Sequence, residues 1–133
     1  MKAILGLLFV TLAAVNVQAA NPLKEHMEAM DKTYKAVLKQ VGNAAQNPSS
    51  IKMFQDLEKL TYECIAILPA RLDFLALDEA RIKQIVYQRM MSQLLIMILD
   101  GEEMLQKSDN AGAKGVLGKM AELKFAGHQI FKP

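Results

Sequence analysis

The sequence predicts an all-α fold, an antiparallel up-down-up-down four-helix bundle preceded by a cleavable signal peptide. Its 133 residues suit one domain, and 52% hydrophobic with 23% charged residues is typical of a chain that folds. Few glycine, proline and aromatic residues disfavour β-structure, whereas leucine, alanine, lysine and nine methionines favour helices. Four segments with helical periodicity, joined by mostly short connections, favour antiparallel neighbours.

The first 19 residues have the features of a secretory signal peptide. Lys2 precedes an apolar run, 3–15, and Val17-Gln18-Ala19 is a small-x-small cleavage signal. The run is shorter than the roughly 20 residues that cross a bilayer. We therefore expect cleavage after Ala19, a domain of residues 20–133 in the periplasm, and no membrane attachment after cleavage. Lys2 is the only one of 16 basic residues in the signal segment, which leaves a net charge of about +1 against 14 acidic residues, so no nucleic-acid partner is implied.

The first two helices are predicted from N-cap signals and periodic apolar residues. Asn21 and Pro22 open helix one. Its inward residues recur at spacings of three and four: Leu23, Met27, Met30, Tyr34, Val37 and Val41. Residues 46–50 are predicted to form a turn whose serines cap helix two, residues 51–68, which ends before Pro69. Its inward residues are Phe54, Leu57, Leu60, Cys64 and Ile65. We interpret Cys64, the only cysteine, as a buried hydrophobe rather than a reactive thiol.

The third and fourth helices are longer and more apolar. Residues 70–77 are ambiguous between a long connection and a short extra turn. Asp78 is predicted to cap helix three, which ends near Leu105 and turns inward Ile82, Val86, Met90, Leu94, Met97 and Ile98. Residues 108–110 form the last turn and cap before helix four, 111–131. Its glycines Gly112, Gly115 and Gly118 each cost about 1 kcal/mol relative to alanine, and we interpret them as permitting close helix approach.

Several catalytic and metal-binding classes are disfavoured. Neither His26 nor His128 has a glutamate three residues before it, as a ferritin-like di-iron site requires. The sequence has no C-x-x-C-H haem-attachment motif, no G-x-S-x-G elbow, no phosphate loop and no zinc ligand set. We therefore expect that the protein is not an enzyme. We expect His26 to be solvated. A soft-metal site built from the methionines of helix three is an alternative to their packing in the core, which we favour.

A methionine near the start of helix one and a histidine near the end of helix four form the remaining candidate pair. With four antiparallel helices these two positions share one end of the bundle. Met27 and His128 then lie roughly 6 to 8 Å from that end at 1.5 Å per residue. A thioether and an imidazole on facing helices are a ligand pair for haem iron. Met30, one turn further along, is either a wall of such a pocket or ordinary core.

Two terminal stretches resemble the soluble cytochrome b562 family. Residues 23–30, LKEHMEAM, are similar to its opening L-x-x-x-M-E segment, whose methionine is an axial ligand. Residues 118–129, GKMAELKFAGHQ, are similar to its closing helix, whose histidine is the other ligand. The family carries basic residues one turn before and after that histidine, as Lys124 and Lys132 stand here, able to pair with haem propionates. The middle of the chain departs from the family, since helix three is more apolar, the loop before it differs, and Gly127 stands where an aromatic is common.

The resemblance implies one noncovalent haem b per chain, held by Met27 and His128. Both axial positions are then filled, so the implied function is one-electron transfer, with an unidentified redox protein meeting the exposed haem edge. The alternative is a haem-free periplasmic bundle that acts as an interaction module or homodimer. The glycines of helix four and the apolar character of helix three motivate this alternative.

Overall fold

The computed structural model describes residues 22–67, 69, 72 and 75–131, and these residues form an all-helical fold. The elements are α1 (Pro22–Gln40), the short 3-10 helix η1 (Ala44–Gln46), α2 (Asn47–Ile65), α3 (Leu77–Gln106) and α4 (Asn110–Phe131). The expected all-α class with four helices is confirmed. The signal segment 1–19, Asn21 and Lys132 lie outside the described residues.

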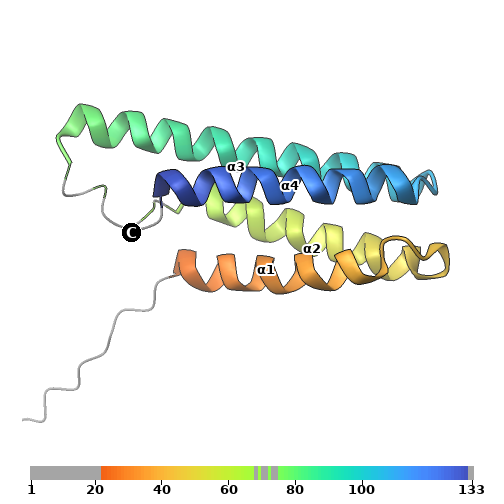
Figure 1. The fold of residues 1–133 in the computed structure, drawn as a ribbon. Coiled ribbons are helices and arrows are strands. Elements are labelled where there is room, and N and C mark those ends of the chain that lie inside the picture. The colour runs from red at the N-terminus through yellow and green to blue at the C-terminus, as the bar shows by residue number, and fades with distance from the viewer. Residues whose placement is uncertain (1–21, 68, 70–71, 73–74, 132–133) are drawn as a thin grey trace, which may run out of the picture.

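The four helices lie side by side along one long axis, and each packs mainly on its neighbours in the sequence (Figure 1). Two contacts locate the helices along this axis: His26 near the start of α1 meets Glu63 near the end of α2, and Met90 in the middle of α3 lies beside Gly127 near the end of α4. The start of α1 and the end of α4 share one end of the molecule, which we call the terminal end. The opposite end holds the α1–α2 and α3–α4 connections, and we call it the turn end.

Side-chain hydrogen bonds tie the two connections of the turn end together. Asn110 Nδ2 donates to the Val41 carbonyl and to Asn47 Oδ1, both at 2.6 Å. Asp109 caps α4, because its Oδ1 accepts from the Gly112 N–H at 2.8 Å, which agrees with the cap predicted in residues 108–110. Ser108 has a φ of 61°, a left-handed conformation that reverses the chain between α3 and α4.

The helix boundaries differ from the predicted ones mainly at the starts of α2 and α3. α2 begins at Asn47 because Pro48 is well suited to a first helical turn, and Gln46 takes the N-cap position expected of a serine. Ser50 is buried and accepts from Gln40 Nε2 at 3.0 Å. α2 ends at Ile65, earlier than predicted. Of the ambiguous residues 70–77, Leu77 begins α3 and the others fall in the α2–α3 connection, where residues 70, 71, 73 and 74 lie outside the described residues. Asp78 lies inside the first turn of α3, where its carboxylate complements the helix dipole instead of capping the helix.

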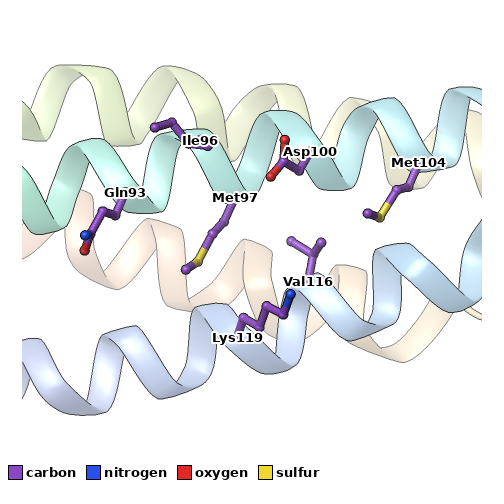
Figure 2. Close-up of a pocket in the computed structure, with 7 residues that line it drawn as sticks. All are labelled: Gln93, Ile96, Met97, Asp100, Met104, Val116 and Lys119. Atoms are coloured by element: carbon purple, nitrogen blue, oxygen red, sulfur yellow. The ribbon is translucent and has the colours of Figure 1, made fainter.

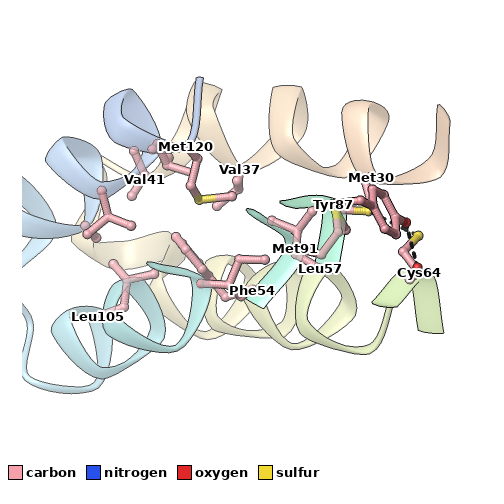
Figure 3. Packing of buried hydrophobic residues seen from close by; sticks show 14 residues of the cluster. Met30, Val37, Val41, Phe54, Leu57, Cys64, Tyr87, Met91, Leu105 and Met120 are labelled. Atoms are coloured by element: carbon pink, nitrogen blue, oxygen red, sulfur yellow. Dashed lines mark hydrogen bonds between the residues drawn. The ribbon is translucent and has the colours of Figure 1, made fainter. Parts of the chain in front are cut away.

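One hydrophobic core extends along the bundle (Figure 3). The predicted inward residues of the first two helices are in it or packed against it. The buried cluster comprises Met30, Val37, Val41, Phe54, Leu57, Cys64, Tyr87, Met91, Ile98, Leu105, Ala113, Val116, Leu117 and Met120. The prediction for Ile82 was wrong, because this side chain is exposed and Tyr87 is the residue near the start of α3 that enters the core. Met97 and Met104 pack against the core, as the packing interpretation expected.

One close helix contact at a glycine was not predicted. A Cβ at Gly101 in α3 would overlap the ring of the fully buried Phe54. Around Gly115 and Gly118 in α4, by contrast, a Cβ would meet nothing. The interpretation of these two α4 glycines as close-approach positions was therefore wrong. The interpretation holds for Gly112, because a Cβ there would meet the Asp109 side chain and the sulfur of Met104 in α3.

Candidate functional site

Long side chains bridge the seam between α1 and α4, which share a much smaller interface than the other neighbouring helices. Tyr34 in α1 donates its hydroxyl to the Leu117 carbonyl in α4 at 2.9 Å. One turn nearer the terminal end, Lys124 Nζ contacts Asp31 Oδ1 at 2.5 Å. Both bridges use polar groups at the ends of long side chains rather than close-packed apolar surfaces. α1 and α4 are therefore the pair of adjacent helices least firmly joined.

The Asp31–Lys124 ion pair fixes the register of the candidate ligands Met27 and His128. Met27 lies four residues before Asp31 in α1, and His128 lies four residues after Lys124 in α4. The two helices run in opposite directions past each other, so both residues lie one helical turn, about 6 Å, from the ion pair and toward the terminal end. Residues four apart share a helix face, so Met27 lies on the same face of α1 as Asp31, and His128 lies on the same face of α4 as Lys124. The sulfur and the imidazole thus belong to one level of the bundle.

The two candidate ligands differ in their surroundings. Met27 is half-buried and packs against the core, whereas His128 is exposed in the last turn of α4. Phe131, three residues beyond His128, packs edge-on against Tyr87 with ring centroids 5.7 Å apart. The Tyr87 hydroxyl in turn donates to the Cys64 carbonyl at 2.6 Å. An aromatic pair therefore closes the core at the terminal end, next to the level of the candidate ligands.

Met30 and Cys64 are neighbours inside that closed core (Figure 3). The Cys64 thiol lies 4.0 Å from the Met30 sulfur, and both residues are buried. Burial, together with the smaller effect of the charge of Glu63, raises the pKa of the Cys64 thiol to about 11. The thiol is therefore protonated and inaccessible, which agrees with its interpretation as a buried hydrophobe. Met30 is a core residue in this structure, which was one of its two sequence interpretations.

Lys124 already has an acidic partner on α1. The Asp31 carboxylate forms ion pairs with both Lys124 and Lys35, and Lys35 Nζ lies 2.6 Å from Asp31 Oδ2. The hydrogen bond from Lys124, and then that from Lys35, holds the pKa of the Asp31 carboxyl below its usual value of 3.8. A haem propionate near Lys124 would thus share this cation with Asp31. The second predicted propionate partner, Lys132, lies outside the described residues.

His26 is partly exposed at the surface, and its ring is also hydrogen-bonded to protein groups. Its Nδ1 lies 2.6 Å from the Pro22 carbonyl and its Nε2 lies 2.8 Å from Glu63 Oε2 in α2. The hydrogen bond to the Pro22 carbonyl and then that to Glu63 raise the pKa of His26 above its ordinary 6.5. His26 consequently joins the start of α1 to the end of α2, and both of its ring nitrogens are engaged.

A separate cavity of about 410 Å³ lies between α3 and α4 (Figure 2). The sulfur-bearing side chains of Met97 and Met104 line it together with the charged Asp100 and Lys119. His128 is nine residues beyond Lys119, which is about 13 Å along α4. The cavity is therefore at a different level of the bundle from Met27 and His128.

The donor set at the terminal end fits a haem iron in its chemistry. Thioether sulfur and imidazole nitrogen are the axial pair of six-coordinate haem proteins with methionine and histidine ligation, and here they occur at one level of the least firmly joined helix pair. The described residues contain no group of three or more histidine, cysteine, aspartate or glutamate side chains that could hold a metal ion. None of the described helices has the length and apolarity needed to cross a membrane.

Comparison of the chain with protein-family profiles, curated proteins and solved structures finds no match to any of them.

Proposed function

We propose that this chain is a secreted periplasmic haem b protein that transfers single electrons, built as an antiparallel up-down-up-down bundle. The observation that supports the proposal is the ion pair between Asp31 and Lys124, from which we infer that Met27 and His128 share one level at the terminal end. The resemblance of residues 23–30 and 118–129 to the soluble cytochrome b562 family supports the same pair. One noncovalent haem per chain then follows from one such pair per chain.

The chain's own residues would have distinct tasks in this function. The Met27 sulfur and a ring nitrogen of His128 would bind from opposite helices and exclude other axial ligands, such as oxygen or substrate. Bound haem supplies a one-electron iron couple, whose potential methionine ligation raises relative to two histidines. Lys124 and Lys132 would neutralise propionates at the open end. Met30 and the buried residues around it keep water from the interior side of the site.

The proposal also predicts what has to move. Phe131 packs on Tyr87 three residues beyond His128, so we expect this aromatic contact to change when Met27 and His128 hold a haem. The Tyr87 hydrogen bond to Cys64 lies deeper and belongs to the closed core. A redox partner would then meet the haem edge at the terminal end in a small and short-lived interface.

The test is the absorption spectrum of the full-length chain exported by a bacterium, purified from the periplasm and titrated with haemin. We expect a sharp low-spin spectrum on reduction, which Met27→Leu and His128→Gln each abolish. Leucine keeps the volume of methionine without its sulfur. The matched controls Met97→Leu and His26→Gln should keep the spectrum, and circular dichroism should show that all four variants are folded. A spectrum of free haemin with the unaltered chain ends the proposal.

A haem-free interaction bundle is the second candidate function. The observation that favours it is a row of exposed isoleucine and leucine side chains on α3, away from Met27 and His128. Failure of haemin to bind, together with a specific association through this row, would select it.

A further inference from the structure

α3 has two apolar faces, of which the core covers only one. The second face is exposed: the exposed fractions are 61% for Ile82, 39% for Ile85, 59% for Ile96 and 43% for Leu99. Exposed polar residues, Arg89 and Ser92, continue the row between them. We call these six residues the outer stripe. Their spacing is three, four, three, four and three residues, which is the spacing of a coiled-coil seam.

The outer stripe is chemically symmetric about its midpoint, which falls between Met90 and Met91. Counting outward from that midpoint, Arg89 matches Ser92, and an apolar residue matches an apolar residue at the two further positions. The matched apolar pairs are Ile85 with Ile96 and Ile82 with Leu99. A two-fold axis perpendicular to the helix would therefore bring apolar residues opposite apolar residues in two copies. Such self-complementarity is what an isologous dimer interface requires.

We propose that the outer stripe of α3 is a docking surface for a second copy of this chain, paired antiparallel in that register. The parallel alternative would put Arg89 opposite Arg89 of the partner subunit, which is unfavourable for like charges. The antiparallel pairing puts Arg89 opposite Ser92 of the partner subunit. Ser92 can enter an apolar seam because its hydroxyl already donates to the Gln88 carbonyl at 2.7 Å. The aliphatic stem of Arg89 can cover apolar surface while its guanidinium stays in water.

The charges beside the stripe suit the same pairing on the flank that faces α2. On this flank Arg81 comes one residue before Ile82, and Glu102 comes three residues after Leu99. Because Ile82 is opposite Leu99 of the partner subunit, Arg81 lies beside Glu102 of the partner subunit, and symmetry makes this contact twice. Glu102 is held on this side because its Oε1 accepts from Gln55 Nε2 of α2 at 2.9 Å.

On the flank that faces α4, Glu79 comes opposite Asp100 of the partner subunit, and these charges repel. Asp100, however, lines the α3–α4 cavity together with Lys119, whose positive charge reduces that repulsion. The two flanks therefore largely offset each other, and the repulsion between the two Arg89 side chains in the parallel pairing sets the direction.

The interface is small, and it is independent of the haem site. Four apolar side chains per copy are fewer than a standard stable interface contains, so we expect a reversible dimer with a Kd on the order of 10 to 100 µM. The stripe lies on α3, which shares no large interface with α1. Dimerisation is therefore expected with or without haem, and its test does not depend on the haemin titration.

Sedimentation velocity of the full chain across that concentration range tests the association. We expect Ile82→Lys to raise the Kd roughly tenfold or more, because each dimer loses both contacts with Leu99. Phe125→Lys, at an exposed apolar residue of α4 outside the stripe, is the matched control and should leave the Kd unchanged. Arg89→Leu should lower the Kd by completing the apolar seam. A chain that stays monomeric at millimolar concentration, or equal weakening by Ile82→Lys and Phe125→Lys, overturns the proposal and leaves the stripe to another partner or to solvent.

Disulfide trapping tests the register. One preparation carries Ile85→Cys and another carries Ile96→Cys, while the native Cys64 is buried. In the antiparallel register these two positions are opposite each other, whereas residue 85 of the two copies lies about 16 Å apart along the axis, too far for a disulfide. We expect oxidation to link the mixture of the two preparations and to leave each preparation alone unlinked. Linking of either preparation by itself, at the rate of the mixture, contradicts the register.

Discussion

The two ends of this bundle are closed in different ways. At the turn end, Asn110 joins the α1–α2 and α3–α4 connections through hydrogen bonds, and aliphatic residues such as Val41 and Leu105 are fully buried. At the terminal end, the closing groups are an edge-on aromatic pair, Tyr87 and Phe131, and ion pairs that include His26–Glu63. Aliphatic packing and the hydrogen bonds of Asn110 therefore close the turn end, whereas aromatic and ionic contacts close the terminal end.

Because of this difference, we expect the turn end to be rigid and the terminal end to rearrange more easily. Fully buried aliphatic side chains resist rearrangement because their interior is close-packed. Partly exposed contacts open at a lower free energy than the core does. The seam between α1 and α4 also has the smallest interface of the adjacent helix pairs. A ligand that needs the helices to adjust would therefore find the terminal end easier to enter.

The largest expected effect compares one phenylalanine from each half. Phe54→Ala should lower the free energy of unfolding by about 4 kcal/mol, because Phe54 is fully buried and its removal leaves a cavity. Phe131→Ala should lower it by only about 1 to 2 kcal/mol, because Phe131 is partly exposed in the last turn of α4. Urea denaturation of both variants measures the difference. Equal losses would mean that the two ends are equally important for stability.

A pair of glycines gives effects of opposite sign. Gly101→Ala should destabilise the fold by about 2 kcal/mol, because the new methyl group overlaps the ring of the fully buried Phe54, which then has to shift. Gly115→Ala should stabilise it by about 1 kcal/mol, because a Cβ there meets nothing and alanine is the better helix former. Thermal melting of both variants provides the measurement. A stabilising Gly101→Ala would show that the contact between α2 and α3 is loose.

The smallest expected effect is a pH dependence at the terminal end. The Pro22 carbonyl and then Glu63 raise the pKa of His26 above 6.5, so the folded state binds its proton more tightly than the unfolded state does. The resulting stabilisation is complete below pH 6.5 and is lost as pH rises through the raised pKa. His26→Gln should remove this fall in stability, as urea denaturation at a series of pH values would measure. An unchanged pH profile in His26→Gln would assign the dependence to other groups.

The sequence predicts the first two helices better than the last two, and the reason is the number of apolar faces. α1 and α2 each have one such face, and its residues enter the core. α3 has two, and periodicity alone does not distinguish the exposed Ile82 from the buried Tyr87. The choice depends on which face meets α2 and α4, which is a property of the assembled bundle.

The candidate site shows the same limit. Met27 and His128 can be selected from their distances to the helix ends. The ion pair that sets their register joins Asp31 and Lys124, which are 93 residues apart. His26 and Glu63 are 37 residues apart and lie near the ends of consecutive helices, so opposite charges at such ends are a usable signal for antiparallel neighbours.

The buried position of Cys64 would have a consequence in the oxidising compartment to which we propose that the chain is exported. The protein contains no second thiol with which this sulfur could pair, and the folded state does not present it to other molecules. Only a chain that has not finished folding, or has lost its fold, exposes this sulfur to oxidants. Disulfide-linked dimers through Cys64 would therefore form only from unfolded chains. Their yield under oxidising conditions would measure how often the protein unfolds.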